Sequence, residues 1–149
     1  SQNLALAAAR AAIARKFPNI DTSKVNDSAV KVTLENTGGP SGGVIFTLGL
    51  IDLLTPEDLL QGRDIAGTGT INVRGVVGPI GGIRQKIYSA LNAGDEYMLV
   101  PSENCADLSK SQLSKIRVIP VSNLSDALSV MKQIASDDLP RNLAVCNGD

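Results

Sequence analysis

Residues 30–54 read VKVTLENTGGPSGGVIFTLGLIDLL, in which an alternating segment, a glycine-rich turn and a long apolar run follow one another directly. Apolar and polar residues alternate over residues 29–34, as is typical of a half-buried strand. Residues 42–54 are apolar on nearly every side, which predicts a helix buried inside the domain. The stretch therefore predicts a strand that leads through a glycine turn into a core helix.

Helices and strands are predicted on both sides of this stretch. Before it, the alanine-rich residues 4–16 predict a helix with Asn3 as its cap. After it, residues 65–73 and 76–77, interrupted by glycines, predict short strands in a bent hairpin. The predicted inner face of the first helix consists of Leu4, Ala8, Ala11 and Ala12, and its outer face of Arg10 and Lys16.

The second half of the chain predicts an alternation of strands and helices. GPIGG at residues 78–82 opens a helix that ends at Gly94 and buries Ile83, Ile87, Ala90 and Leu91. Core strands are predicted at residues 97–100 and 116–121, with a short helix at 104–110 between them. Ser122 or Asn123 caps a final helix that ends near Ile134, and residues 136–149 predict a polar, loop-like tail. These elements predict an α/β or mixed α+β fold in a single compact domain, residues 1–149.

Composition excludes several classes of function. A chain of 149 residues with 43% hydrophobic and 19% charged residues has the size and balance of one globular domain. The net charge is −1, without a run of like charge, so we expect no nucleic-acid partner. The chain has no histidine, which excludes Ser-His-Asp and Cys-His pairs and most zinc sites. Two cysteines are too few for a cysteine-rich metal site, and we expect no metal.

No segment of the sequence predicts membrane insertion. The longest apolar stretch, residues 44–54, is far shorter than the roughly 20 residues that a spanning helix needs. No signal peptide is recognisable, and the chain begins at Ser1 rather than at a methionine. We therefore expect a mature or trimmed fragment, from which a targeting element could have been removed.

The glycine-rich turn at residues 38–43 places Ser41 just before the buried helix, where free backbone amides favour anions. One interpretation is phosphate binding, although the P-loop lysine and hydroxyl and the GxGxxG pattern are missing. A second is that Ser41 is a nucleophile whose neighbouring amides stabilise an oxyanion. A third is that Ser41 simply caps the helix, the commonest role of such a serine. The turn by itself does not distinguish these roles.

A nucleophilic serine needs a base, and without histidine the candidates are Asp, Glu or a lysine with a lowered pKa. Lys86 lies one turn into the second glycine-started helix, at one margin of its apolar face, and Arg84 lies at the other margin. Helix geometry does not choose between them, but a guanidinium cannot lose its proton, so of these two residues only Lys86 can accept a proton. The alternative is that Lys86 is a surface lysine whose stem covers apolar surface.

Four motifs follow one another: GPSGG at 39–43, IAGTGTI at 65–71, GPIGGI at 78–83 followed by Lys86, and VP at 100–101 with Asn104. In their order, and in the 45 residues from Ser41 to Lys86, they resemble the proteolytic domain of Lon peptidases. The resemblance covers about residues 30–128. The GTGTI form and the Asn104-Cys105 pair are more similar to the stand-alone branch, in which this domain follows a PDZ module.

The resemblance implies the fold of the Lon proteolytic domain and an ATP-independent serine endopeptidase with a Ser-Lys dyad, acting through an acyl-enzyme without any cofactor. Ser41 matches the nucleophile, Lys86 the general base, and Thr68 a threonine that holds the lysine amine. The oxyanion loop is expected at Gly38, Gly39, Pro40 and Gly42. Gly38, Gly42 and Thr70 replace an acidic residue, an alanine and a glutamate of ATP-dependent relatives, which leaves loop preorganisation and cleavage preference open.

The resemblance also implies a polypeptide substrate, a homo-oligomeric ring such as a hexamer, and an upstream PDZ module in the full-length protein. Because the PDZ-linked branch acts outside the cytoplasm, we expect the extracytoplasmic face of a bacterial membrane, with the cytoplasm as the alternative. We also expect a disulfide between Cys105 and Cys146, with two free thiols as the alternative. The rival functions are a catalytically silent Lon-like scaffold or partner-binding domain, and a small-anion or nucleotide module.

Overall fold

The computed structural model of the chain describes residues 2–16, 18–19, 42–54, 65–136 and 143–147. The strand predicted at residues 29–34 lies outside these residues, as do Ser41 and the preceding Gly38, Gly39 and Pro40. None of the described helices is long and apolar enough to cross a membrane.

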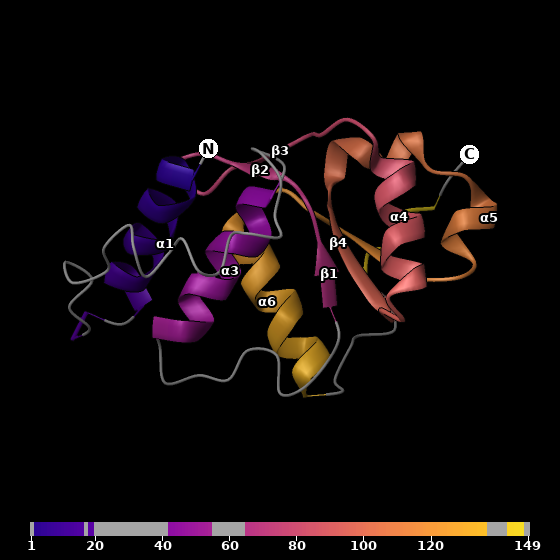
Figure 1. The fold of residues 1–149 in the computed structure, drawn as a ribbon. Helices are drawn as coiled ribbons and strands as arrows, with labels where there is room; N and C mark the ends of the chain where they lie inside the picture. Colours follow the sequence, from indigo (N-terminus) through magenta and orange to yellow (C-terminus); the bar gives the residue numbers. More distant parts are fainter. Residues whose placement is uncertain (1, 17, 20–41, 55–64, 137–142, 148–149) are drawn as a thin grey trace.

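A three-stranded parallel sheet runs through the middle of the described part, in the order β1-β4-β5 (Figure 1). β1 (Ile65–Gly67) pairs with β4 (Tyr97–Pro101), and β4 pairs with β5 (Arg117–Val121). All residues of β4 after Tyr97 are buried. Such a nearly continuous apolar strand is expected in a parallel sheet that is covered on both faces.

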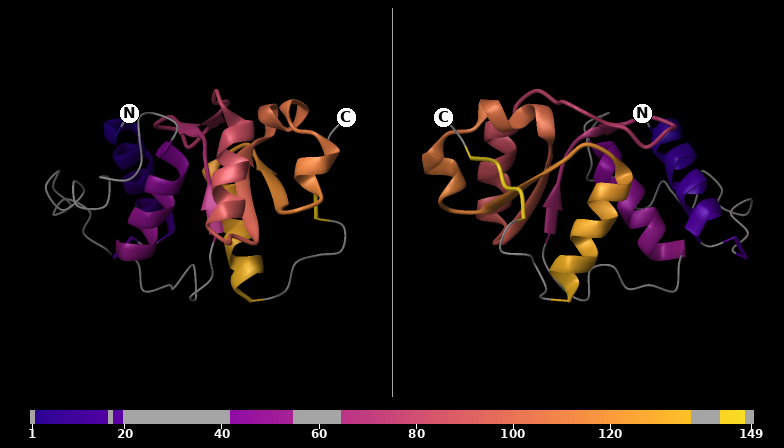
Figure 2. Two further views of the ribbon diagram at one scale, coloured as in Figure 1. Left: turned by 45° about the vertical axis from the view of Figure 1, so that its right-hand side comes forward. Right: turned by 180° about the vertical axis from the view of Figure 1, so that it is seen from behind.

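Helices cover both faces of this sheet (Figures 1 and 2). α1 (Gln2–Lys16), α3 (Gly43–Leu54) and α6 (Leu124–Ala135) lie on one side, and α4 (Ile83–Asn92) and α5 (Lys110–Leu113) lie on the other. Because side chains of a strand point alternately to its two faces, β4 contributes to two cores. Leu99 belongs to the core with α1, α3 and α6, whereas Met98 and Val100 belong to the core with α4.

Two further elements connect the sheet to the helices. β2 (Thr70–Ile71) and β3 (Val77–Gly78) form an antiparallel hairpin between β1 and α4. η2 (Ser102–Asp107) is a 3-10 helix that follows β4 without a break. The end of β1, the hairpin and η2 therefore surround the start of α4, and this junction holds the candidate site.

The structure confirms the mixed α and β fold class and most predicted elements. The predicted core helix, the second glycine-started helix and the final helix correspond to α3, α4 and α6. Of the two predicted caps for the final helix, Asn123 is the one used, since its side chain accepts a hydrogen bond from the Asp126 N–H at 2.8 Å. Capping by Asn side chains satisfies an amide that the helix leaves unpaired.

Three details of the sequence-based prediction are wrong: the buried face of α1, its predicted cap, and the helix at residues 104–110. In α1, Ala11 is exposed while Ala9 and Ile13 are buried, and Arg10 is half-buried rather than outward. Alanine occurs all around this helix, so periodicity does not define a face, and packing against α3 decides it. The helix also begins at Gln2, so Asn3 lies inside its first turn.

The predicted helix at residues 104–110 is instead two elements, η2 and α5. Ser109 begins α5 with a capping box, in which its side chain accepts from the Gln112 N–H while the Gln112 side chain accepts from the Ser109 N–H. This cap starts a new helix just where the prediction continued the earlier one.

Candidate active site

Lys86 donates a hydrogen bond from Nζ to the hydroxyl Oγ1 of Thr68, at 3.1 Å. Lys86 lies in the first turns of α4, and Thr68 is the residue directly after β1. Thr68 is only 2% exposed, and Lys86 is half-buried. Desolvation lowers the pKa of Lys86 below its ordinary value, because burial disfavours the charged ammonium. The pair is therefore a lysine amine of lowered pKa held by an uncharged hydroxyl.

The glycine on each side of Thr68 allows α3 to pack closely against this segment. A Cβ atom at Gly67 would lie 2.5 Å from Ile45 Cδ1, and one at Gly69 would lie 2.9 Å from Val44 Cγ2. Gly69 also has a φ of 142°, which residues with a side chain rarely adopt. Glycine at positions 67 and 69 thus allows this close packing of α3.

α4 begins in a way that leaves Lys86 at the margin of its buried face. The helix is preceded by Gly82, whose backbone has the left-handed conformation with a φ of 70° and which provides no side-chain cap. The Lys86 N–H then donates to the Gly82 carbonyl at 3.2 Å, and Ile83 and Ile87 bury the inner face of the helix. Only glycine adopts this backbone conformation at little cost, which explains why the helix starts after Gly82.

Arg84 and Lys86 contact different neighbours, although sequence periodicity placed them on equivalent margins. Arg84 is exposed, and its Nε donates to the backbone carbonyl of Asp107 in η2 at 2.8 Å. Lys86 instead reaches Thr68. Of these two basic residues, only Lys86 can lose its proton, and Lys86 is the one that contacts the buried hydroxyl of Thr68.

The helix that follows the predicted nucleophile docks on the same segment. The Val44 N–H in the first turn of α3 donates to the Gly69 carbonyl at 3.1 Å. Gly42, from the predicted oxyanion loop, is half-buried and lies directly before α3. Of the predicted site residues, the structure brings Lys86 and Thr68 together, whereas Ser41, Gly38, Gly39 and Pro40 lie outside the described residues.

Cys105 and Cys146 are joined by a disulfide, with an S–S distance of 2.01 Å and a Cα–Cα distance of 5.2 Å. Cys146 is buried in the same core cluster as Ile83 and Ile87 of α4, and its N–H donates to the Val118 carbonyl at 3.0 Å. The bridge therefore fastens the chain end near residue 146 over the core on which α4 rests.

Asn104 is a residue whose place sequence reasoning missed, since it entered only as part of a motif. Its side chain is 2% exposed and pairs with the backbone of Ile80, just before α4. The signal in the sequence is weak: it is a single polar residue after a core strand. Because its partner lies 24 positions away along the chain, local periodicity does not reveal the contact.

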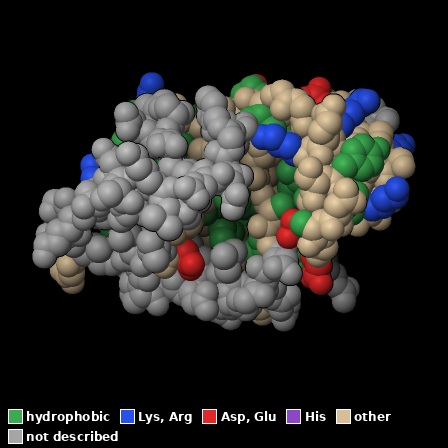
Figure 3. Space-filling view, viewed as in Figure 1, with side chains coloured by type: hydrophobic (Ala, Val, Ile, Leu, Met, Phe, Trp, Pro, Cys, Tyr) green, Lys and Arg blue, Asp and Glu red, His purple; other side chains and the backbone are tan. Residues whose placement is uncertain are grey.

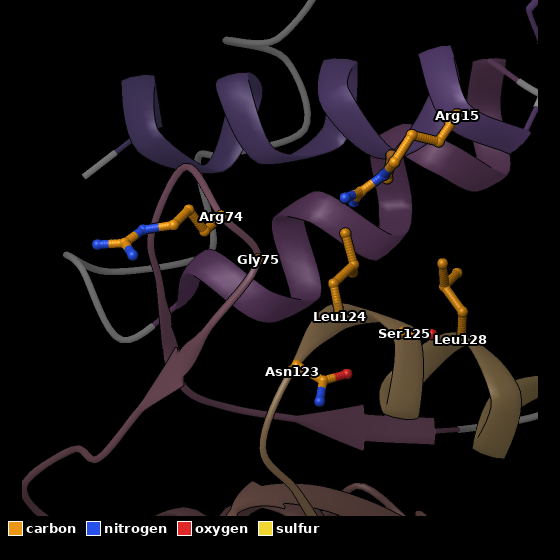
Figure 4. Close-up of a pocket in the computed structure, with 8 residues that line it drawn as sticks. Arg15, Arg74, Gly75, Asn123, Leu124, Ser125 and Leu128 are labelled. Carbon is orange, nitrogen blue, oxygen red and sulfur yellow. The ribbon is translucent and has the colours of Figure 1, made fainter.

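A separate pocket of about 340 Å³ lies where α1, the hairpin turn and the start of α6 meet (Figure 4). In this view the Arg74 side chain extends away from Leu124 and Leu128, and Arg15 reaches in from α1. The residues of the lining are Ala12, Arg15, Arg74, Gly75, Asn123, Leu124, Ser125 and Leu128. Neither Lys86 nor Thr68 is among them, so this pocket is not the candidate active site.

The surface and the acidic side chains suggest no further centre in the described residues. On the face in Figure 3, the Lys and Arg side chains over α4 and α5 have Asp and Glu side chains in their neighbourhood, so the described surface there is not uniformly basic. Within the described ranges, no group of three or more His, Cys, Asp or Glu side chains could hold a metal ion.

A family model and several known proteins are similar in sequence to this chain. Residues 1–133 match the Lon protease (S16) C-terminal proteolytic domain. A Lon protease of Trichlorobacter lovleyi is 36% identical over 95 residues, which are 62% of this chain and 11% of that protein. A Lon protease of Azorhizobium caulinodans is 38% identical over 93 residues, 60% of this chain and 11% of that protein.

A third relative, Lon protease 2 of Herpetosiphon aurantiacus, is 39% identical over 95 residues, 62% of this chain and 11% of that protein. The chain thus spans about a tenth of the length of these relatives. The match over residues 1–133 includes the segment with Thr68 and the helix with Lys86, and it covers nearly the whole chain. This protein therefore belongs to the family of the Lon protease (S16) C-terminal proteolytic domain.

Proposed function

We propose that this domain is a serine endopeptidase that hydrolyses peptide bonds with Ser41 as nucleophile and Lys86 as general base, without ATP or a metal. The observation that carries the proposal is the hydrogen bond from Lys86 Nζ to Thr68 Oγ1 at 3.1 Å. It holds an amine whose pKa burial has lowered, and a general base must be partly neutral at the working pH. Membership of the Lon proteolytic domain family supports the reaction class.

In the proposed reaction, the neutral Lys86 amine takes the proton of Ser41 Oγ as that oxygen attacks the carbonyl carbon of the peptide. Thr68 accepts one N–H of the amine and so orients the amine for this proton transfer. The tetrahedral intermediate then collapses, and the Lys86 ammonium gives its proton to the leaving amine. Water, deprotonated by Lys86, hydrolyses the acyl-enzyme ester and regenerates Ser41.

The turn that contains Ser41 is proposed to supply the oxyanion donors. Gly38, Gly39, Pro40 and Gly42 surround the serine in sequence, and free amides before a helix start stabilise negative charge. The docking of α3 on Gly69 supports this proposal, because it ties the helix after the turn to the segment with Thr68. The substrate class proposed for the site is an extended polypeptide.

The decisive experiment compares peptide cleavage by the wild-type chain with that of Ser41→Ala and Lys86→Arg. We expect both variants to lose acylation, because arginine keeps the charge but cannot accept the proton. Lys115→Arg, a conservative change at an exposed lysine, is the matched control and should cleave at the wild-type rate. Substantial cleavage by Lys86→Arg would assign the base to another group, and a folded wild type that cleaves no peptide would favour a silent scaffold.

We also propose that the full-length protein carries this domain after a PDZ module, on the extracytoplasmic side of a bacterial membrane, and that it assembles into a ring. The Cys105–Cys146 disulfide supports this location, because disulfides persist in oxidising compartments and are rare in the cytosol. Sedimentation velocity over a range of concentrations tests the ring, and a species that is monomeric at all concentrations but fully active would show that assembly is dispensable.

A further inference from the structure

We propose that Asn104 is a positioning residue for Lys86, because its side chain fixes the backbone at Ile80 and thereby sets where α4 begins relative to Thr68. The inference rests on the proposed role of Lys86 as the base. It concerns the supports of the site, and it assigns to Asn104 no contact with the substrate or the reacting atoms.

The Asn104 side chain makes three hydrogen bonds, two of them to the backbone of Ile80. Oδ1 accepts the Ile80 N–H at 3.0 Å, and Nδ2 donates to the Ile80 carbonyl at 3.0 Å. Nδ2 also donates to Oδ2 of Asp107 at 3.0 Å, which orients the amide. A primary amide offers an acceptor and two donors in one plane, whereas alanine offers neither and a carboxylate offers no donor. The contact is therefore specific for the amide.

The position of α4 depends on this contact because the helix lacks a side-chain cap of its own. Gly82 has a left-handed conformation and no side-chain hydrogen bond, so the segment from Ile80 to Gly82 enters α4 unsupported by a local motif. Asn104 holds Ile80 on one side of this entry, and the bond from Arg84 Nε to the Asp107 carbonyl holds the helix on the other. Both supports come from η2.

The same central strand fixes both partners of the hydrogen bond between Lys86 and Thr68. The Thr68 N–H donates to the Leu99 carbonyl of β4 at 3.0 Å. η2 continues directly from β4, and its Cys105 is bridged to Cys146, which is itself bonded to β5. Thr68 is thus positioned by a residue in the middle of β4. Lys86 is positioned from the end of β4, where η2 begins, through Asn104. A loss of Asn104 would release only one of the two partners.

The test uses the full chain with Asn104→Ala and two readouts. We expect kcat to fall about 10- to 100-fold with little change in KM, since small displacements of a reacting group have effects of this size. The second readout is the pKa of the Lys86 amine, measured from competitive acetylation with acetic anhydride over a range of pH and mass spectrometry of the Lys86 peptide. This pKa should rise toward the ordinary lysine value as Lys86 becomes more solvated, and the extent of acetylation of the exposed Lys115 serves as the internal reference.

The matched control is Asn123→Ala, which removes a hydrogen-bonded asparagine side chain from the start of α6. It should lower the melting temperature but leave kcat and the reactivity of Lys86 at their wild-type values. Asn104→Ala with a wild-type kcat and an unchanged Lys86 pKa would overturn the proposal. Equal changes in Asn123→Ala would also overturn it, because the effect would then be general destabilisation.

A second variant covers the case in which Asn104→Ala does not fold. Asp107→Ala removes only the carboxylate that orients the Asn104 amide and leaves the backbone contact of Arg84 intact. It should shift kcat and the Lys86 pKa in the same direction by a smaller amount, and an unchanged pKa there would then decide against the proposal. Because acetylation needs no turnover, it tests Asn104 even if the wild-type chain cleaves no peptide and the proposed function fails.

Discussion

Removal of the Cys105–Cys146 disulfide is expected to destabilise the domain strongly. The bridge joins residues 41 positions apart, and closing a loop of this length lowers the entropy of the unfolded chain. In the chain-entropy model this corresponds to about 4 kcal/mol. For a domain of this size about 2–4 °C of melting temperature corresponds to each kcal/mol, so full reduction should lower Tm by roughly 8–16 °C.

The assay is thermal unfolding of oxidised protein with and without a phosphine reductant, followed by circular dichroism. Thiol titration after denaturation should find no reactive thiol in the unreduced protein and two after reduction. Cys105→Ala/Cys146→Ala is the control, since it should melt near the reduced protein and be insensitive to reductant. The alanine at position 146 also avoids placing a hydroxyl in the apolar core.

Two results would refute this reasoning. Two reactive thiols in unreduced, denatured protein would show that the bridge does not form, and would weaken the proposed extracytoplasmic location. An unchanged Tm after complete reduction would show that the chain near Cys146 is held by other contacts, such as its hydrogen bond to Val118, or that the unfolded chain is already restricted.

Four further predictions concern the candidate site and the segment that supports it. Peptide cleavage should rise with pH through the lowered pKa of Lys86 and level off below the pH at which an ordinary lysine would become neutral, as a pH profile of kcat/KM would reveal. Between the folded-state pKa of Lys86 and its higher unfolded-state pKa, the unfolded chain binds more protons than the folded chain, so Lys86 makes stability rise with pH. Lys86→Met should abolish this rise and increase Tm at neutral pH, and a lower Tm would contradict the prediction. Thr68→Val keeps the shape but removes the acceptor, so kcat should fall about 10- to 100-fold with KM unchanged, and an unaltered kcat in steady-state assays would remove Thr68 from the site. Gly69→Ala combines a positive φ with a close approach to Val44, and should cost about 1–3 kcal/mol in urea unfolding, whereas the exposed Gly49→Ala should be neutral or stabilising.

Much of the fold could be predicted because it is written in short-range patterns. The apolar residues of α3, the 3.6-residue repeat of α4 and the short apolar runs of β4 and β5 each indicate an element without knowledge of the rest. The prediction failed in α1, where alanine surrounds the helix and gives no preferred face, and at residues 104–110, where the capping box of Ser109 separates two helices.

For the candidate site, residue types alone limit the chemistry: the chain has no histidine and arginine cannot accept a proton, so a nucleophilic serine would depend on Asp, Glu or a lysine. Local sequence patterns do not reveal that Lys86 contacts Thr68 while Arg84 contacts η2, or that Asn104 holds Ile80; the folded arrangement does. The physical reason is separation along the chain. These partners lie 18, 23 and 24 positions apart, far beyond the range of helix or strand periodicity, and the packing of α4 beside η2 and the end of β1 brings them together.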